Sequence, residues 1–246
     1  MHLISDTGIL LDLRPHGENH AVAQIFTQSH GRIVGLVHGG QGRRQQPNVQ
    51  IANIVQCEWR GRTHDQLGTL SLELLHNPSA AVLHDGARLA ALQFLSLLLS
   101  RILPEHHAYG ALHGAYEKFL RVLSAPDWLT QYIHLECFVL SELGYGLDLS
   151  RCAMTDEKNS DALAYISPKT GRAATAAAAC GYEAQLFPLP RFFLVDVSAT
   201  PACLAAGLRI TGHFLHAAFA DNVPNRLWNM HQAIVPKTNR SAKVAA

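Results

Sequence analysis

Apolar and polar residues alternate in five runs along the first third of the chain, and turn-forming residues separate these runs. Alternation of this kind is typical of strands that bury one face. The runs cover residues 8–14, 21–27, 32–38, 51–60 and 67–75. Their number and spacing predict a small five-stranded barrel. Barrels of this size are most often OB-folds, which bind oligonucleotides across one face, although the fold alone does not establish that function.

The pattern changes to a helical period at Asn77 and Pro78, which suit an N-cap and a first helical turn. Apolar residues then recur at helical spacing as far as Leu103, and similar repeats cover residues 106–123 and 126–143. Three successive helices with short links predict a bundle. The longest apolar run belongs to the first helix and is shorter than the roughly 20 residues that a bilayer requires, so we expect a buried core helix and no membrane contact.

Residues 147–190 interrupt the helical pattern. Tyr165 and Ile166, followed by a turn at residues 169–171, predict a short β-hairpin. The alanine-rich run at residues 173–179 fits either a helix or a linker. The segment is therefore expected to form a small insertion in the helical region.

Helical spacing returns after the insertion. Thr200 and Pro201 suit a cap and a first-turn proline, and Pro224 opens a final helix. Residues 236–246 have the polar, basic composition that is typical of a disordered tail.

Together these patterns predict an α+β chain with a barrel domain over residues 1–77 and a helical domain over residues 78–246. With 246 residues, 48% of them hydrophobic, the chain can bury a sizeable core. Its five cysteines are odd in number and scattered, and no signal peptide precedes them. We therefore expect reduced thiols, no disulfide and a cytoplasmic location.

Charge is nearly balanced, with a formal net charge of +1. This excludes the strongly basic character of a nucleic-acid coat protein, so any polyanion site must be local. The first 76 residues carry six arginines and six acidic residues, whereas residues 200–246 carry five basic residues and one acidic residue. Fifteen histidines add positive charge at lower pH, because the ordinary pKa of histidine is about 6.5.

The third predicted strand leads into an unusual loop, Gly39-Gly40-Gln41-Gly42-Arg43-Arg44. Glycines allow a backbone to bend or to approach a ligand closely, and arginine guanidiniums offer forked donors that suit phosphate oxygens. The loop therefore indicates a nucleic-acid contact. The alternative is a solvated hairpin loop with incidental arginines.

Motifs of common enzyme classes are absent from the sequence, including the Gly-x-Ser-x-Gly elbow, the Gly-Lys-Ser/Thr phosphate loop and the His-Glu-x-x-His zinc helix. The glycine-rich loop at 39–42 precedes Pro47 and another strand rather than a helix, which disfavours a dinucleotide site. His213 and His216 have a spacing compatible with two metal ligands, but no carboxylate neighbours them. We expect a non-enzyme with no catalytic residue, no cofactor and no metal.

Several short strings, in this order and spacing, resemble the bacterial RecO family of DNA repair and recombination mediators. The resemblance extends over essentially the whole chain. Its strings are Asp6-Thr7-Gly8-Ile9-Leu10-Leu11, Gly17-Glu18-Asn19, His30-Gly31-Arg32, Gly39-Gly40-Gln41-Gly42-Arg43-Arg44, Glu142 to Cys152, Tyr165 to Arg172 and Gly207-Leu208-Arg209.

The resemblance implies an N-terminal OB-fold, a helical bundle and a zinc-finger-like insertion. It also implies binding of single- and double-stranded DNA, annealing of complementary strands, and loading of RecA together with RecR and the C-terminal tail of single-stranded DNA-binding protein. The location implied is the bacterial nucleoid. These roles come from the family.

The insertion departs from the family pattern, because many members carry two Cys-x-x-Cys pairs that would bind zinc. Here Cys152 is the only cysteine left of one pair, and Cys180 stands alone where the second pair would be. Two thiols cannot complete a structural zinc site, so we predict that packing holds the hairpin together. Residual metal binding at Cys152 and Cys180 stays open.

The candidate DNA contacts are basic residues of the barrel segment. They are Arg32, His38, Arg43, Arg44, Arg60 and Arg62. Relatives commonly have lysine or arginine in place of His38, so the contribution of this residue should depend on pH. Arg60 and Arg62 straddle Gly61 at a strand end, where side chains reach the rim of a barrel. The alternative for each residue is a solvated position on that rim.

The barrel segment has only two aromatic residues for base stacking, Phe26 and Trp59, and both could equally belong to the core. We therefore expect contacts to the DNA backbone with little sequence preference. The balanced charge and scarce aromatics also allow another function, a protein-interaction adaptor whose DNA affinity is incidental.

Overall fold

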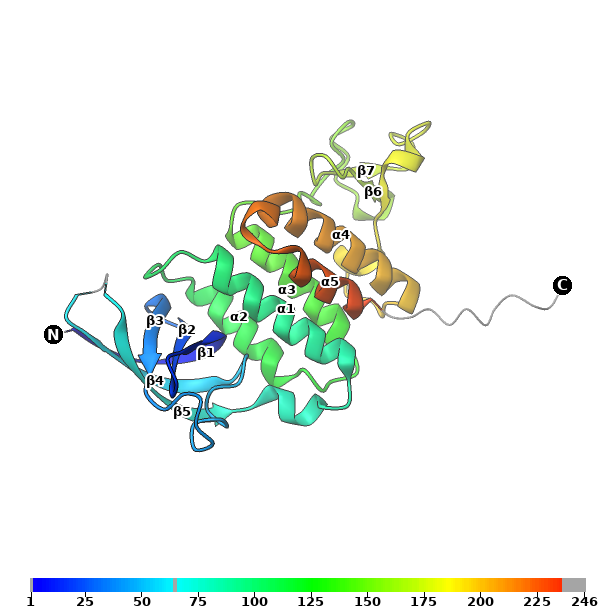
Figure 1. Ribbon diagram of the computed structural model, residues 1–246. Coiled ribbons are helices and arrows are strands. Elements are labelled where there is room, and N and C mark those ends of the chain that lie inside the picture. The colour runs from blue at the N-terminus through cyan, green and yellow to red at the C-terminus, as the bar shows by residue number, and fades with distance from the viewer. Residues whose placement is uncertain (1, 64–65, 236–246) are drawn as a thin grey trace. The chain divides into compact units, whose positions relative to one another are not determined.

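The computed structural model describes residues 2–63 and 66–235 (Figure 1). The predicted tail at residues 236–246 lies outside the described residues. The chain forms two compact units, one comprising Met1–Ala125 with Asp221–Ile234 and the other comprising Pro126–Ala220. The first unit therefore includes helices on both sides of the second in sequence, and the predicted division at residue 77 falls inside it.

Five strands close a barrel in the first unit, in the order β1-β2-β3-β5-β4. Neighbouring strands are antiparallel except β3 and β5, which are parallel. The strands are β1 (His2–His16), β2 (His20–Thr27), β3 (Gly31–Val37), β4 (Ile54–Gly61) and β5 (Gly68–His76). Strand β4 begins three residues later than predicted. The reason is that Ala52 takes a left-handed turn, with φ of 66°, and donates its N–H to Leu10 O at 2.7 Å.

The barrel core contains both aromatic residues of the segment. Phe26 and Trp59 are buried, and the Trp59 Nε1–H donates to Val34 O at 2.9 Å. Gly61 and Gly68 lie against the indole, where a Cβ on either glycine would come within 2.3 Å of a ring carbon. Because Trp59 fills this part of the core, the two positions at the ends of the β4–β5 connection have no room for a side chain and require glycine.

Helices complete the first unit. Asn77 caps a short 3-10 helix, Pro78–Val82, by accepting the Ala80 N–H, and helix α1 (Gly86–Ile102) begins only after a second cap at Asp85. The prediction of one continuous helix from Asn77 was wrong, because the cap and the proline belong to the 3-10 turn. Helix α1 packs against β1 and α5 (Asn225–Ile234), and α2 (Gly110–Arg121) contacts β2.

The second unit pairs two helices, α3 (Trp128–Glu142) and α4 (Pro201–Phe219). Thr200 caps α4 as predicted, because its side chain accepts the Cys203 N–H at 3.3 Å. The insertion lies between these two helices in sequence and forms a small sheet of order β7-β6-β8. Its strands are β6 (Leu163–Ile166), β7 (Ala173–Thr175) and β8 (Phe187–Pro188). The predicted hairpin is present as β6 and β7. The alanine run was wrongly expected to be helix or linker throughout, because its first residues pair with β6.

None of the helices in the described ranges has enough length and apolar character to cross a lipid bilayer.

Candidate nucleic-acid interface

The glycine-rich loop after β3 is tied to the turn between β1 and β2 by one side chain, that of Gln41. Its Nε2 donates to Gly17 O at 3.0 Å and to His20 O at 2.8 Å, and its backbone N–H donates to Asn19 O at 3.3 Å. The Gly39 N–H adds a bond of 3.2 Å to His20 Nδ1. These bonds fix the loop on the end of the barrel.

The glycines of this loop have conformational and steric roles. Gly39 has a φ of +67°, in the left-handed region that favours glycine. A Cβ on Gly40 would lie 2.8 Å from the Ala21 Cβ, so a side chain there would push the loop off β2. The Gly42 N–H closes a turn on Gly39 O at 2.8 Å. The glycines therefore shape a defined turn rather than a free hinge.

Arg43 and Arg44 follow this turn with exposed side chains. Within residues 2–63 and 66–235, neither guanidinium forms an ion pair or a hydrogen bond. The anchored loop thus presents two adjacent positive charges to solvent, with forked donors that suit phosphate oxygens.

Three histidines share this end of the barrel. His16 and His20 are cross-strand partners beside the β1–β2 turn, and the rings of His20 and His38 make an edge contact with centroids 5.0 Å apart. His38 is exposed at the end of β3.

Arg32 has a different environment from the loop arginines. Its largely buried side chain donates to Leu103 O at 2.8 Å and to Gln24 Oε1 at 3.0 Å, and it pairs with Glu105 Oε1 at 3.2 Å. The His106 N–H donates to Arg32 O at 3.0 Å, so the segment before α2 lies along β3. The guanidinium of Arg32 holds this segment to the barrel.

Arg60 and Arg62 lie on the other long connection of the barrel. Arg60 is the penultimate residue of β4 and pairs with Glu58 at 3.1 Å, while Arg62 is exposed in the β4–β5 connection. The end of β4 lies beside the start of β1, where Gly61 is the register partner of His2, and Figure 1 shows it apart from the β3–β4 loop. The structure therefore groups His38, Arg43 and Arg44 at one place, and Arg60 with Arg62 at another.

Gln41 and His20 were missed by the sequence interpretation. The available signal was the polar side chain inside the string Gly-Gly-Gln-Gly, because a glutamine between glycines has no packing role of its own and can only act through hydrogen bonds.

The insertion contains a buried cysteine, Cys152, whose sulfur is hydrogen-bonded. The Sγ of buried Cys152 accepts the Thr175 N–H at 3.4 Å. Burial raises the pKa of Cys152, but hydrogen bonds from the Thr155 side chain and from backbone N–H groups outweigh burial and lower this pKa to about 6. Cys180 is exposed, so the residue that faces Cys152 is Thr175.

This donor set does not fit a structural zinc site, because it offers one thiolate beside two threonines. The described residues contain no group of three or more histidine, cysteine or acidic side chains that could hold a metal ion. On α4, the His213 Nε2 hydrogen-bonds to Pro168 O at 3.0 Å.

Comparison with known proteins identifies the relationship. A family model described as "Recombination protein O N terminal" matches residues 1–78, and one described as "Recombination protein O C terminal" matches residues 83–226. The chain belongs to the RecO family. The two matches meet at the 3-10 helix Pro78–Val82, between β5 and α1. The resemblance noted in the sequence is thereby confirmed.

Family relatives match along most of their length. The chain is 41% identical over 211 residues to the DNA repair protein RecO of Rhodospirillum centenum, which covers 86% of this chain and 84% of that protein. It is 38% identical over 222 residues to the DNA repair protein RecO of a Ruegeria species, covering 90% and 91%. For the protein of the same name from Rhodospirillum rubrum the identity is 37% over 219 residues, covering 86% of each.

Proposed function

We propose that this chain is a non-enzymatic DNA-binding protein that acts in DNA repair as a recombination mediator, with its barrel working as an OB-fold. The observation that carries the proposal is the loop anchored by Gln41, which presents Arg43 and Arg44 with no ion pair or hydrogen bond from their guanidiniums to the described residues. The relatives of this family that match the chain are DNA repair proteins, which supports the same conclusion.

The contacts proposed are to the sugar–phosphate backbone. Phe26 and Trp59 are both buried in the barrel core, so neither of these two rings is open to stacking by a base. Arginine donors read phosphate without regard to sequence. Binding by the barrel therefore has little sequence preference and extends to single- and double-stranded DNA, with His38 as a further contact beside the loop arginines.

The nearly neutral net charge favours a protein that binds DNA transiently, as a mediator does, over one that coats DNA tightly. A few phosphate contacts on a nearly neutral protein give modest, salt-sensitive affinity, so a bound strand can be released once it has paired with its complement. We extend the proposal to annealing of complementary strands and to help in loading RecA together with RecR and the tail of single-stranded DNA-binding protein, as family membership suggests.

The test is binding of a fluorescent single-stranded oligonucleotide at several salt concentrations. Arg43→Ala/Arg44→Ala should weaken binding and make the log–log salt slope shallower by about 1.4, because about 0.7 counterions are released per neutralised phosphate of a single strand. The control Arg121→Ala/Arg151→Ala removes the same charge from arginines that pair with Glu117 and Asp156. This control should keep most of the affinity.

Equal effects of the two double variants would show that only net charge matters and would refute the loop as a phosphate contact. No binding by the unmodified protein would favour the adaptor alternative, in which barrel and helices bind proteins.

A further inference from the structure

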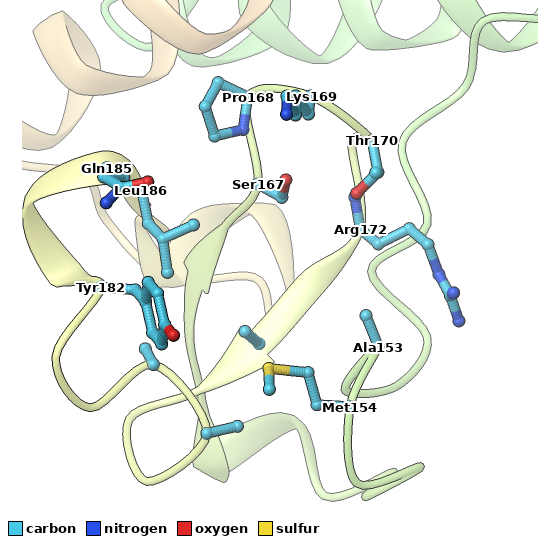
Figure 2. A pocket seen from close by; sticks show the side chains of 13 residues that line it. Ala153, Met154, Ser167, Pro168, Lys169, Thr170, Arg172, Tyr182, Gln185 and Leu186 are labelled. Atoms are coloured by element: carbon cyan, nitrogen blue, oxygen red, sulfur yellow. The ribbon is translucent and has the colours of Figure 1, made fainter.

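A hollow of about 470 Å³ opens in the insertion, and all of its lining comes from residues 153–186. The apolar part of its lining includes four alanines, Pro168 and Leu186. Figure 2 shows Tyr182 and Leu186 on one side of this hollow and Met154 on the other. The volume falls in the range of sites that hold a small planar ligand, roughly 300–1,000 Å³.

Two large side chains at the rim of the hollow are exposed to solvent. Tyr182 is 59% exposed and Met154 is 69% exposed, although both are large and apolar over most of their surface. Tyr182 makes no ring contact with another described residue. Tyr145, the other strongly exposed tyrosine among the described residues, packs its ring edge-to-face against Phe219 with centroids 5.1 Å apart. Tyr182 thus offers a free aromatic face beside an apolar hollow.

All charge in the lining is positive. Lys169 is exposed and pairs with none of the described acidic residues, and Arg172 lies 3.5 Å from Asp148 with both side chains about two-fifths exposed. Solvated pairs of this kind are weak, so both cations can act on an incoming anion. Ser167, Thr170 and Gln185 add hydrogen-bonding groups to the lining. The hollow suits a ligand with a flat ring, a polar edge and a nearby negative charge.

We propose that this hollow binds an unpaired nucleobase of single-stranded DNA. The base stacks on Tyr182, and its flanking phosphates lie near Lys169 and Arg172. The proposal rests on the proposed function and adds to the barrel a second contact with a different selectivity. Because a base inside a duplex is already stacked on its neighbours, only single strands can use this contact without paying the cost of unstacking.

The experiment compares a thymidine oligonucleotide with an abasic oligonucleotide of the same length, which keeps the phosphates but has no bases. The unmodified protein should bind the thymidine strand roughly tenfold more tightly, as expected for the stacking of about one base. Tyr182→Ala should abolish most of this preference and leave abasic binding unchanged, while Tyr182→Phe should keep it. Tyr145→Ala is the control for loss of an exposed tyrosine and should keep the preference.

Failure of this proposal differs from failure of the proposed function. If the unmodified protein binds both strands equally, and with the salt dependence attributed to Arg43 and Arg44, the barrel contact stands and the base site is refuted. An acidic peptide with an aromatic C-terminus whose binding depends on Tyr182, without any base preference, would show a peptide site and overturn the proposal. If the unmodified protein binds neither strand, both the base site and the proposed DNA-binding function are refuted.

Discussion

The Gln41 side chain donates to His20 O at 2.8 Å and thereby ties the β3–β4 loop to the β1–β2 turn. This amide helps the backbone N–H groups of Gly39 and Gln41 to position the loop that carries Arg43 and Arg44, and it adds no charge. Position and charge can therefore be separated by experiment.

Gln41→Ala should weaken DNA binding several-fold, because the loop arginines would lose their fixed position and ordering them on DNA would cost conformational entropy. The salt slope should change little, since both charges remain. Fluorescence anisotropy at several salt concentrations measures both quantities. The matched control is Gln46→Ala, which removes an exposed glutamine from the same loop. An equal loss of affinity in both variants would contradict an anchoring role for Gln41.

Gly68→Ala should destabilise the barrel by about 1–3 kcal/mol, because its new Cβ would overlap the Trp59 ring in a filled core. The control is Gly114→Ala on α2, where a Cβ meets no atom within 4 Å. This second change should be neutral or stabilise by about 0.5–1 kcal/mol, since alanine favours a helix over glycine. Urea unfolding measures both. Equal midpoints for the two variants would show that Trp59 can move aside.

His113 should make stability depend on pH. Its ring is buried on α2 against Phe26, with centroids 5.2 Å apart, and neither ring nitrogen has a hydrogen-bond partner in the part of the chain that the structure describes. Burial lowers the pKa of His113 from its ordinary 6.5, and the charges of Glu117 and Asp6 only partly oppose this effect. The unfolded chain then binds a proton more readily than the folded protein. Stability should be fully present above about pH 6.5 and fall as the pH drops below it.

The measurement is the free energy of unfolding between pH 7.5 and 5. His113→Phe keeps a ring but cannot take up a proton, so its stability should fall less over this range. His84→Ala, at an exposed histidine, is the control and should keep the pH dependence of the unmodified protein. Parallel curves for the unmodified protein and His113→Phe would place the titrating group elsewhere.

Local signals and tertiary packing can be told apart at particular positions. Asn77 and Pro78 form a real cap and first turn, but the turn is 3-10 and ends before α1, because Asp85 provides a second cap that competes for the helix start. The alanines at 173–175 have no side chains to reveal a strand, and their backbone pairing with β6 decides their structure. Which residue caps a helix and which segment joins a sheet therefore depend on residues that are neighbours in space.

Some features of the candidate interface are likewise visible in the sequence, and others depend on the tertiary structure. The sequence alone identified the glycine-rich loop and its arginines, because glycine and arginine have distinctive chemistry wherever they lie. Arg32 and the loop arginines are the same residue type, yet the guanidinium of Arg32 is occupied by Leu103 O, Gln24 and Glu105. No local pattern distinguishes them, since the partners of Arg32 include residues more than 70 positions away in the chain.

The sequence by itself determined the five strands, the hairpin, the later helices and the family, since period-two alternation, caps and short motifs are local properties of a chain. Only the tertiary structure decided that Phe26 and Trp59 are core residues, that Gln41 anchors the basic loop and that Tyr182 borders a hollow. The physical reason is that burial and hydrogen-bond partners depend on which segments meet when the barrel closes and the insertion folds back on itself.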